Sequence, residues 1–172
     1  MNPSVNFESS REVALSLEKA WQFLSGERAM FDVLVEMPAC PTFADFSVFM
    51  PLAVDAGART AGVGVLIQRE DATIVASHMF GIPKDDIQEA DLRDACAEVC
   101  NVFSGCVAPN IGHTSSICIG LPTLASSADF DEISKGSVIT LTYRCDQQIK
   151  RLFVLVYGVF LAPNNGANHG HP

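Results

Sequence analysis

Residues 94–105 read Asp94-Ala-Cys-Ala-Glu98-Val-Cys-Asn101-Val-Phe-Ser-Gly105, and this stretch decides how the rest of the chain is interpreted. Successive residues of an α-helix lie ~100° apart. This spacing puts one group of apolar side chains on a single broad side, which we expect to be buried: Leu92, Ala95, Cys96, Val99, Val102, Phe103 and Cys106. Asp94, Glu98 and Asn101 fall within roughly 60° of one another on the opposite side. The stretch therefore predicts a helix with one buried side and a polar stripe that faces outward.

Capping signals predict two further helices around this one. An N-cap residue followed three residues later by Glu marks a helix start, and Gly or Pro marks an end. The expected helices are residues 10–25, begun by Ser9 with Glu12 and ended by Gly26; residues 71–80, begun by Asp71 and ended by Gly81 and Pro83; and the helix of the polar stripe, begun by Asp86 with Glu89 and ended by Gly105.

Apolar, β-prone runs between turn residues predict strands on both sides of these helices. The expected strands are Phe31–Met37, stopped by Pro38 and Pro41; Val48–Val54 and Gly62–Ile67, joined as a hairpin through Asp55-Ala-Gly; Ser116–Leu121; Val138–Cys145, with Ile139, Leu141 and Tyr143 on one face; and Leu152–Leu161. The fold class is therefore mixed α/β.

The order of elements also predicts an internal pseudo-repeat. Residues 18–26 are similar to residues 98–105. Two segments of the first half, Ser47–Met50 and Val63–Ile67, match residues 137–140 and 153–157 at a constant offset of 90. Two halves of one helix and three strands would explain this, and chance similarity within an α/β chain is the alternative.

Length and charge narrow the classes of function. The chain has 172 residues, which fits one domain, over 1–162, followed by a flexible tail at 163–172 that is mostly Asn, Gly and His. Asp and Glu outnumber Lys and Arg by 20 to 11, giving a net charge of -9. Binding to a nucleic-acid backbone requires clustered basic residues, so no nucleic-acid partner is expected.

The hydropathy pattern argues against a membrane protein and against a disulfide scaffold. The longest apolar run, Leu152 to Ala162, is eleven residues, short of the ~18–20 of a membrane span. The first ten residues lack a cationic flank and an apolar core typical of a secretion signal. We therefore expect a cytoplasmic protein without membrane contact, whose six cysteines stay reduced and mostly pack as small hydrophobic side chains.

The stripe, together with Ile119-Gly-Leu-Pro122-Thr further along, resembles the CheX/CheC/FliY family of chemotaxis phosphatases. The family signature is an acidic or Ser residue, then E-x-x-N on a surface helix, a Gly that closes the helix, and a downstream strand that ends in Leu-Pro. The likeness extends from about residue 10 to residue 161. It implies a CheC-like fold, a mostly antiparallel sheet of about six strands with helices packed on it.

This resemblance implies hydrolysis of the phosphoaspartate on a CheY-like receiver domain, which ends a two-component signal. Asn101 and Glu98 would be the catalytic residues, and Asp94 and Glu98 would contact the partner. The neutral amide of Asn101 can orient a water molecule, and Glu98 can pair with the receiver's lysine. No metal or cofactor belongs to the chain itself; Mg²⁺ is expected on the partner receiver. The family also implies a homodimer, with Phe31–Val35 and Ser116–Leu121 as candidate edge strands.

Several features leave alternatives open. Trp21 stands where a second Asn would stand if the first half repeated the motif, so Glu18 lacks its partner, and one active helix per chain is expected, as in CheX. The same stripe could belong to a module that binds a receiver, or a flagellar-switch-type partner, without turnover. Cys96 and Cys100, at i and i+4, could serve a thiol or metal sensor, although packing is the simpler explanation. The acidic loop Ala125–Lys135 could be tailored to a partner or merely solvated.

Overall fold

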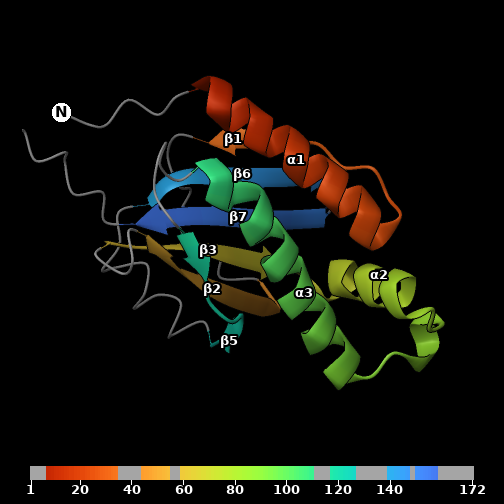
Figure 1. The fold of residues 1–172 in the computed structure, drawn as a ribbon. Coiled ribbons are helices and arrows are strands. Elements are labelled where there is room, and N and C mark those ends of the chain that lie inside the picture. Colours follow the sequence, from red (N-terminus) through yellow and green to blue (C-terminus); the bar gives the residue numbers. More distant parts are fainter. Residues whose placement is uncertain are drawn as a thin grey trace, which may run out of the picture.

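A computed structural model describes residues 7–34, 44–54, 59–110, 117–126, 139–147 and 150–158. Three α-helices lie on one face of an antiparallel sheet (Figure 1). The helices are α1 (Phe7–Ser25), α2 (Arg69–Phe80) and α3 (Glu89–Val107), with short 3-10 turns η2 (Lys84–Asp86) and η3 (Ala108–Asn110) on either side of α3. The strands are β1 (Phe31–Leu34), β2 (Phe46–Val54), β3 (Arg59–Ile67), β4 (Ile117–Ile119), β5 (Thr123–Ala125), β6 (Ile139–Gln147) and β7 (Lys150–Gly158).

The sheet has the order β1-β6-β7-β3-β2-β4, with β5 also paired to β2. The predicted hairpin is confirmed: β2 and β3 pair antiparallel from Phe46 opposite Ile67 to Val54 opposite Arg59. The two segments proposed as edge strands do lie at the two edges, as β1 and β4. The mixed α/β class and the antiparallel sheet are thus confirmed.

The strand count differs from the expected number because one edge position is divided between two short strands. β5 pairs with Ser47–Phe49 and β4 with Leu52–Val54, both on the same side of β2. Pro51 lies between these two ladders and has no N–H to donate, while its carbonyl accepts the N–H of Gly120 at 2.9 Å. The strand predicted at Ser116–Leu121 therefore ends at Ile119, and β5, which was not predicted, follows it.

The strand order is symmetric about its middle. Counted from one edge of the sheet, β1, β3 and β2 are the first, fourth and fifth strands; counted from the other edge, β4, β7 and β6 take the same places. Each of these sets follows a long helix, α1 or α3. This order is compatible with two equivalent halves, but the internal repeat itself stays a prediction.

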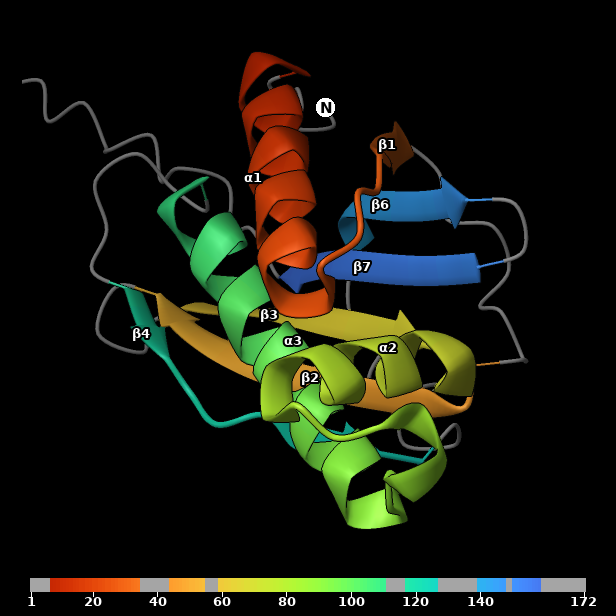
Figure 2. The ribbon, with the colours of Figure 1, turned by 90° about the vertical axis from the view of Figure 1, so that its right-hand side faces the viewer.

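The core lies between the helices and the sheet. α3 packs on β2 and β3, and α1 packs beside it on β1, antiparallel to α3 (Figure 2). α2 contacts the end of α1 and the first half of α3. Core side chains alternate along β2 and recur at helical spacing along α1 and α3, whereas residues 61–67 of β3 are buried in succession. The largest fully buried side chains are Phe103, Leu17, Leu24, Met50, Leu52, Leu66 and Ile67.

Two helix starts differ from the sequence predictions. α1 already includes Phe7, so Ser9 lies inside the helix and does not cap it. α2 begins at Arg69, and Asp71 lies in its first turn, 1% exposed. The carboxylate that satisfies the start of α2 comes from Asp45, whose Oδ2 accepts the Arg69 N–H at 2.7 Å. A residue 24 positions earlier supplies this cap, so the local sequence could not reveal it.

The start and end of α3 also differ from expectation. Asp86 belongs to η2, and the helix begins at Glu89, where the Gln88 N–H donates to Asp91 Oδ2 at 2.8 Å. The predicted end at Gly105 is wrong, because α3 continues to Val107. Positive φ, which lets glycine end a helix, occurs among the described glycines at Gly26 and Gly81 and not at Gly105.

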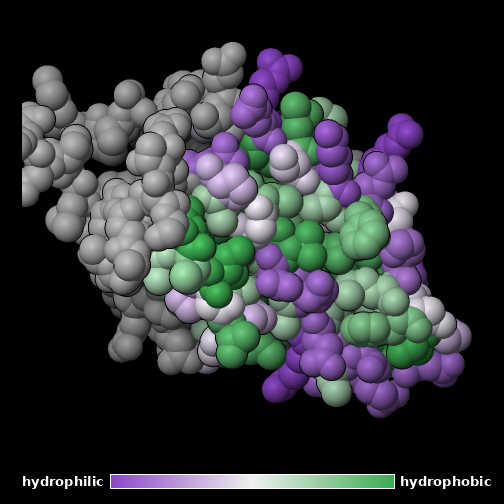
Figure 3. Space-filling model, viewed as in Figure 1, coloured by the Kyte–Doolittle hydropathy of each residue, from purple (hydrophilic) through white to green (hydrophobic). Residues whose placement is uncertain are grey.

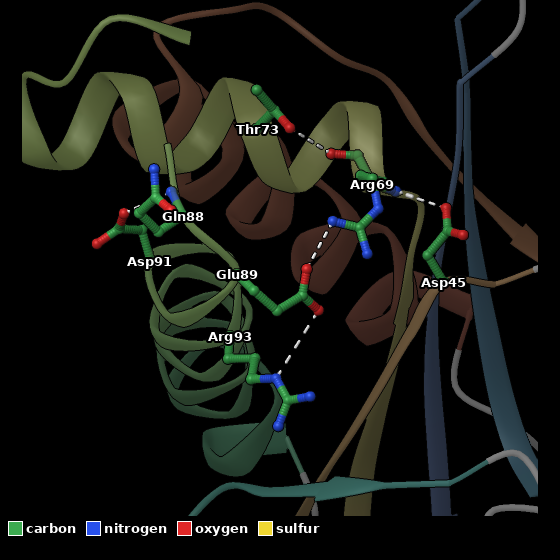
Figure 4. A network of polar contacts seen from close by, with 7 residues as sticks. All are labelled: Asp45, Arg69, Thr73, Gln88, Glu89, Asp91 and Arg93. Carbon is green, nitrogen blue, oxygen red and sulfur yellow. Dashed lines mark hydrogen bonds and ion pairs between the residues drawn. The ribbon is translucent and has the colours of Figure 1, made fainter. Parts of the chain in front are cut away.

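A polar network joins the starts of α2 and α3 (Figure 4). Arg69 Nη1 donates to Glu89 Oε2 at 2.7 Å, and Arg93 Nε lies 3.8 Å from the other oxygen of Glu89. The hydrogen bond from Arg69 lowers the pKa of the Glu89 carboxyl. The Arg69 guanidinium also lies over the ring of Phe46, 5.2 Å from its centroid. These contacts tie the first turn of α3 to α2 and β2.

Some predictions fall outside the described residues. The C-terminal tail at 163–172 lies there, as do most of the loop Ala125–Lys135 and the last residues of the strands predicted at Phe31–Met37 and Leu152–Leu161. The division into one domain over 1–162 and a tail stays a prediction.

Replacing Gly26 with alanine is expected to destabilise the protein more than replacing Gly81. Both glycines have positive φ, 73° and 66°, which costs an alanine about 1–2 kcal/mol. Only at Gly26 would the new Cβ also meet a side chain, His78 Cδ2 at 2.8 Å. Chemical denaturation measures both losses. When His78 is replaced with alanine, the additional loss of stability at Gly26 should vanish. An equal loss of stability for Gly26→Ala and Gly81→Ala in the wild-type protein would contradict a role for the His78 contact.

Candidate functional site

The polar stripe of Asp94, Glu98 and Asn101 lies on the side of α3 turned away from the sheet. Asp94 and Asn101 are exposed, and Glu98 is partly exposed. Glu98 is the member of the stripe nearest to the side of α3 that carries Val102 and Cys106. Cys106 faces α1, since its Sγ lies 3.7 Å from the Ser16 carbonyl. The expectation of an outward stripe is met, with Glu98 on its α1 side.

Glu98 and Asn101 lie against each other. Asn101 Nδ2 donates to Glu98 Oε2 at 3.4 Å, one helical turn apart. This long bond turns the amide nitrogen toward the carboxylate and leaves Asn101 Oδ1 as an acceptor. Among the described residues no ion pair is formed by Asp94 or Glu98, because the nearby Arg93 is turned to Glu89. The stripe therefore carries two carboxylates whose charge an external cation could neutralise.

The buried side of α3 holds this stripe in place. Phe103 is 0% exposed and meets the ring of Phe31 edge to face, with 5.7 Å between centroids. Cys100 Sγ lies 3.8 Å from the carbonyl oxygens of Val48 and Val63 on β2 and β3. The helix is thus anchored to both halves of the sheet, which keeps the stripe on a rigid element.

In the predicted pseudo-repeat, Glu18 and Trp21 of α1 correspond to Glu98 and Asn101 of α3, and both make contacts within the fold. Glu18 Oε1 accepts the N–H of Phe31 at 3.1 Å, and Trp21 is buried, 4% exposed. Trp21 therefore offers no outward amide, and one oxygen of Glu18 is already bonded to the backbone of β1. This agrees with the expectation that only α3 carries the motif.

The Leu-Pro part of the motif forms the short link between β4 and β5, which run in the same direction along β2. Gly120 sits so close to β2 that an added Cβ would lie 2.9 Å from the carbonyl oxygen of Pro51. Leu121, in this link, is 81% exposed, and β5 continues along β2 in the same direction as β4, next to α3. The link therefore joins the two short strands of the sheet edge that lies beside α3.

The surface around the stripe is divided by polarity. Figure 3 shows hydrophilic side chains in a band over the first half of α3, with hydrophobic side chains on both sides. Exposed apolar side chains come from α1, with Phe23 at 76% exposure, and from the β4–β5 edge, with Leu121 and Leu124. The polar band is thus flanked by apolar side chains that a partner protein could cover.

The cysteines of α3 pack in the core. Burial raises the pKa of both Cys96 and Cys100 to about 12, so both remain thiols at neutral pH. No group of three or more His, Cys, Asp or Glu side chains suited to a metal ion occurs within the described ranges. None of the helices described is long and apolar enough to cross a membrane.

Thiol labelling tests this packing. In the folded protein at pH 8, Cys96 and Cys100 should resist iodoacetamide, because they are buried and their pKa of about 12 leaves almost no thiolate. Cys118, which is exposed, should react. Peptide mass spectrometry distinguishes the sites, and labelling of all three in denaturant is the control. Rapid native labelling of Cys96 or Cys100 would revive the sensor hypothesis.

No family model and no curated protein matches the sequence. Solved structures do match. One is the CheX–CheY–BeF3–Mg²⁺ complex of Borrelia burgdorferi, with 16% identity, a TM-score of 0.65, and coverage of 91% of this chain and 99% of that chain. A CheC-like superfamily protein of Shewanella sp. PV-4 has 10% identity, a TM-score of 0.64, and coverage of 90% and 99%. CheX of Vibrio vulnificus has 12% identity, a TM-score of 0.62, and coverage of 88% and 99%.

The fold is therefore that of the CheX/CheC-like chemotaxis proteins. At these identities the similarity establishes the architecture, and the chemistry has to be argued from the side chains of α3. Glu98 and Asn101 occupy the exposed side of that helix, as the sequence resemblance implied.

Proposed function

We propose that the protein hydrolyses the phosphoaspartate of a CheY-like receiver domain and so ends a two-component signal. The observation that carries the proposal is the carboxylate–amide pair, Glu98 and Asn101, exposed on a rigid helix of a CheX/CheC-like fold. A helix that projects such a pair can enter a shallow active site on another protein. The binding of a CheY in the Borrelia burgdorferi complex supports a CheY-like partner.

Asn101 orients the attacking water in this proposal. Its Oδ1 accepts a hydrogen bond from the water and holds it in line with the phosphorus, in the manner of the water-orienting Gln of GTPases. The water oxygen forms a bond to phosphorus, the bond from phosphorus to the aspartate oxygen breaks, and the carboxylate leaves with that electron pair. The proton from water passes to phosphate or solvent. Asn101 gains no proton at any step, so its effect is one of positioning.

Glu98 and Asp94 hold the partner. Both are carboxylates without an ion pair among the described residues, and Glu98 can bind the lysine ammonium that receivers carry beside their phosphorylated aspartate. Mg²⁺ stays on the receiver, where it offsets the charge of the phosphoryl group. The chain contributes no cofactor of its own, and the reaction belongs in the cytoplasm, where such receivers act.

Phosphate release from an isolated receiver tests the proposal. A receiver phosphorylated with acetyl phosphate is freed of excess donor, and release is followed with and without the protein. Catalytic amounts of the protein should accelerate release, with turnover of many receivers per chain. Binding of the receiver without acceleration would leave the alternative, a non-enzymatic receiver-binding or flagellar-switch-type module.

Replacing Glu98 with glutamine is expected to weaken association with the phosphorylated receiver about tenfold to a hundredfold, the range of a lost charged hydrogen bond. The maximal rate at saturating receiver should change much less, because Glu98 docks the partner and Asn101 orients the water. Glu70→Gln is the matched control, since Glu70 is exposed on α2 and its loss changes the net charge equally. If both variants raise KM equally, the weaker association reflects the change in net charge and not a contact made by Glu98.

The expected homodimer is part of the same proposal. β1 and β4 are the edge strands through which two sheets could join, and Leu121 adds an exposed apolar side chain at the β4 edge. Light scattering coupled to gel filtration measures the mass in solution. A monomer mass at all micromolar concentrations would rule out the homodimer. The chemistry assigned to α3 would be unaffected.

A further inference from the structure

Gly105 is an unusual residue at its place in α3. The helix continues past it to Val107, and its φ is not left-handed. A glycine inside a regular helix lowers stability relative to alanine, because it has more backbone freedom to lose on folding. A helix that ends two residues later gains nothing from a glycine here, so some other requirement has to explain it.

The packing of the protein does not supply that requirement. A Cβ added at Gly105 would meet no atom within 4 Å, whereas a Cβ at Gly26 or Gly120 would collide with neighbouring atoms. Gly105 is exposed on the outward side of α3. The described part of the chain therefore has room for a side chain that the sequence omits.

The omitted side chain would lie over the polar stripe. Gly105 is four residues after Asn101, so the two share one side of the helix, with ~5–6 Å between Cβ positions. Side chains of a helix lean toward its N-terminus, and each covers the surface of the preceding turn. Any long side chain at position 105 would thus fold back over the amide of Asn101.

We infer that Gly105 is a clearance position, which keeps Asn101 open to the phosphorylated segment of the partner. The inference rests on the proposed function and assigns Gly105 a role in access: the missing side chain lets the receiver's backbone approach the amide. Gly105 touches no reacting atom, so it acts through Asn101. Its presence lowers the stability of α3 and raises the accessibility of the site.

A substitution series separates access from folding because the two effects have opposite signs. Gly105→Ala should raise the thermal midpoint by about 2–4 °C for a domain of this size. Gly105→Gln should also be at least as stable as the wild type. Both measurements use the full chain. Dephosphorylation of an acetyl-phosphate-treated receiver should stay within threefold for Gly105→Ala and fall at least tenfold in kcat/KM for Gly105→Gln.

Ala90→Gln is the matched control. It adds the same side chain to an exposed position of α3 that is eleven residues, or ~16 Å, from Asn101. Full activity of this control and loss in Gly105→Gln would support the clearance role. Full activity of Gly105→Gln would overturn it, as would a fall in its thermal midpoint that accounts for the lost activity. If the wild type itself does not accelerate phosphate release, the proposed function fails, whatever the variants do.

Discussion

Replacing Asn101 with alanine is expected to lower the rate of phosphate release at saturating receiver by about 10²–10³-fold, the usual cost of removing one positioned polar group. The variant removes the acceptor that orients water, while Glu98 and Asp94 remain to hold the partner. Affinity for the phosphorylated receiver should therefore change little. Single-turnover phosphate release measures the first quantity, and titration with a beryllofluoride-treated receiver measures the second.

Two controls make this result specific. Asn110→Ala removes an exposed amide at the end of η3, off the stripe, and should leave the rate unchanged. The unfolding free energy of Asn101→Ala should stay within about 0.5 kcal/mol of the wild type, because the side chain is exposed. If Asn101→Ala retains the wild-type rate, Asn101 does not position the water, and the chemistry has to be sought elsewhere on the chain.

Replacing Phe103 with alanine is expected to have the largest effect on stability, a loss of about 3–5 kcal/mol. The ring is 0% exposed and packs edge to face on Phe31, so its removal leaves a cavity between α3 and β1. Urea denaturation measures the loss. Since a domain is stable by only about 5–15 kcal/mol, part of the variant is expected to be unfolded at physiological temperature.

The neighbouring Val102 provides the control for this prediction. Val102 is partly exposed on α3, so Val102→Ala should lose much less stability than Phe103→Ala. Comparable losses at both sites would mean that α3 is held by general hydrophobic contact and that the Phe31 contact has no special part in it. Activity per folded molecule should be retained by both variants, because neither side chain belongs to the stripe.

Helical periodicity predicted both sides of α3 well. Leu92, Val99 and Phe103 are buried as expected, and Asp94 and Asn101 are exposed. This succeeds because a long helix on a sheet must bury one side, and the 3.6-residue period leaves no choice about which side chains share it. The hairpin of β2 and β3 was predictable for the same kind of reason, two apolar runs close together in the sequence.

Helix boundaries were predicted less well, since the groups that satisfy them can come from anywhere in the fold. Asp45, just before β2, supplies the carboxylate at the start of α2, where the sequence predicts Asp71. Gly105 was interpreted as a helix end because glycine often takes a left-handed conformation there, but its φ is helical. Residue type alone does not distinguish a glycine that ends a helix from one that lies inside it.

The order of apolar and polar residues was enough to place the motif on one exposed helix face, since that depends only on backbone geometry within a single segment. What lies beside that face depended on the packing of distant segments. Burial of Trp21 and the bond from Phe31 to Glu18 remove α1 as a second site, and Pro51 divides the sheet edge next to α3. Contacts of this kind join residues far apart in the chain, so no local period records them.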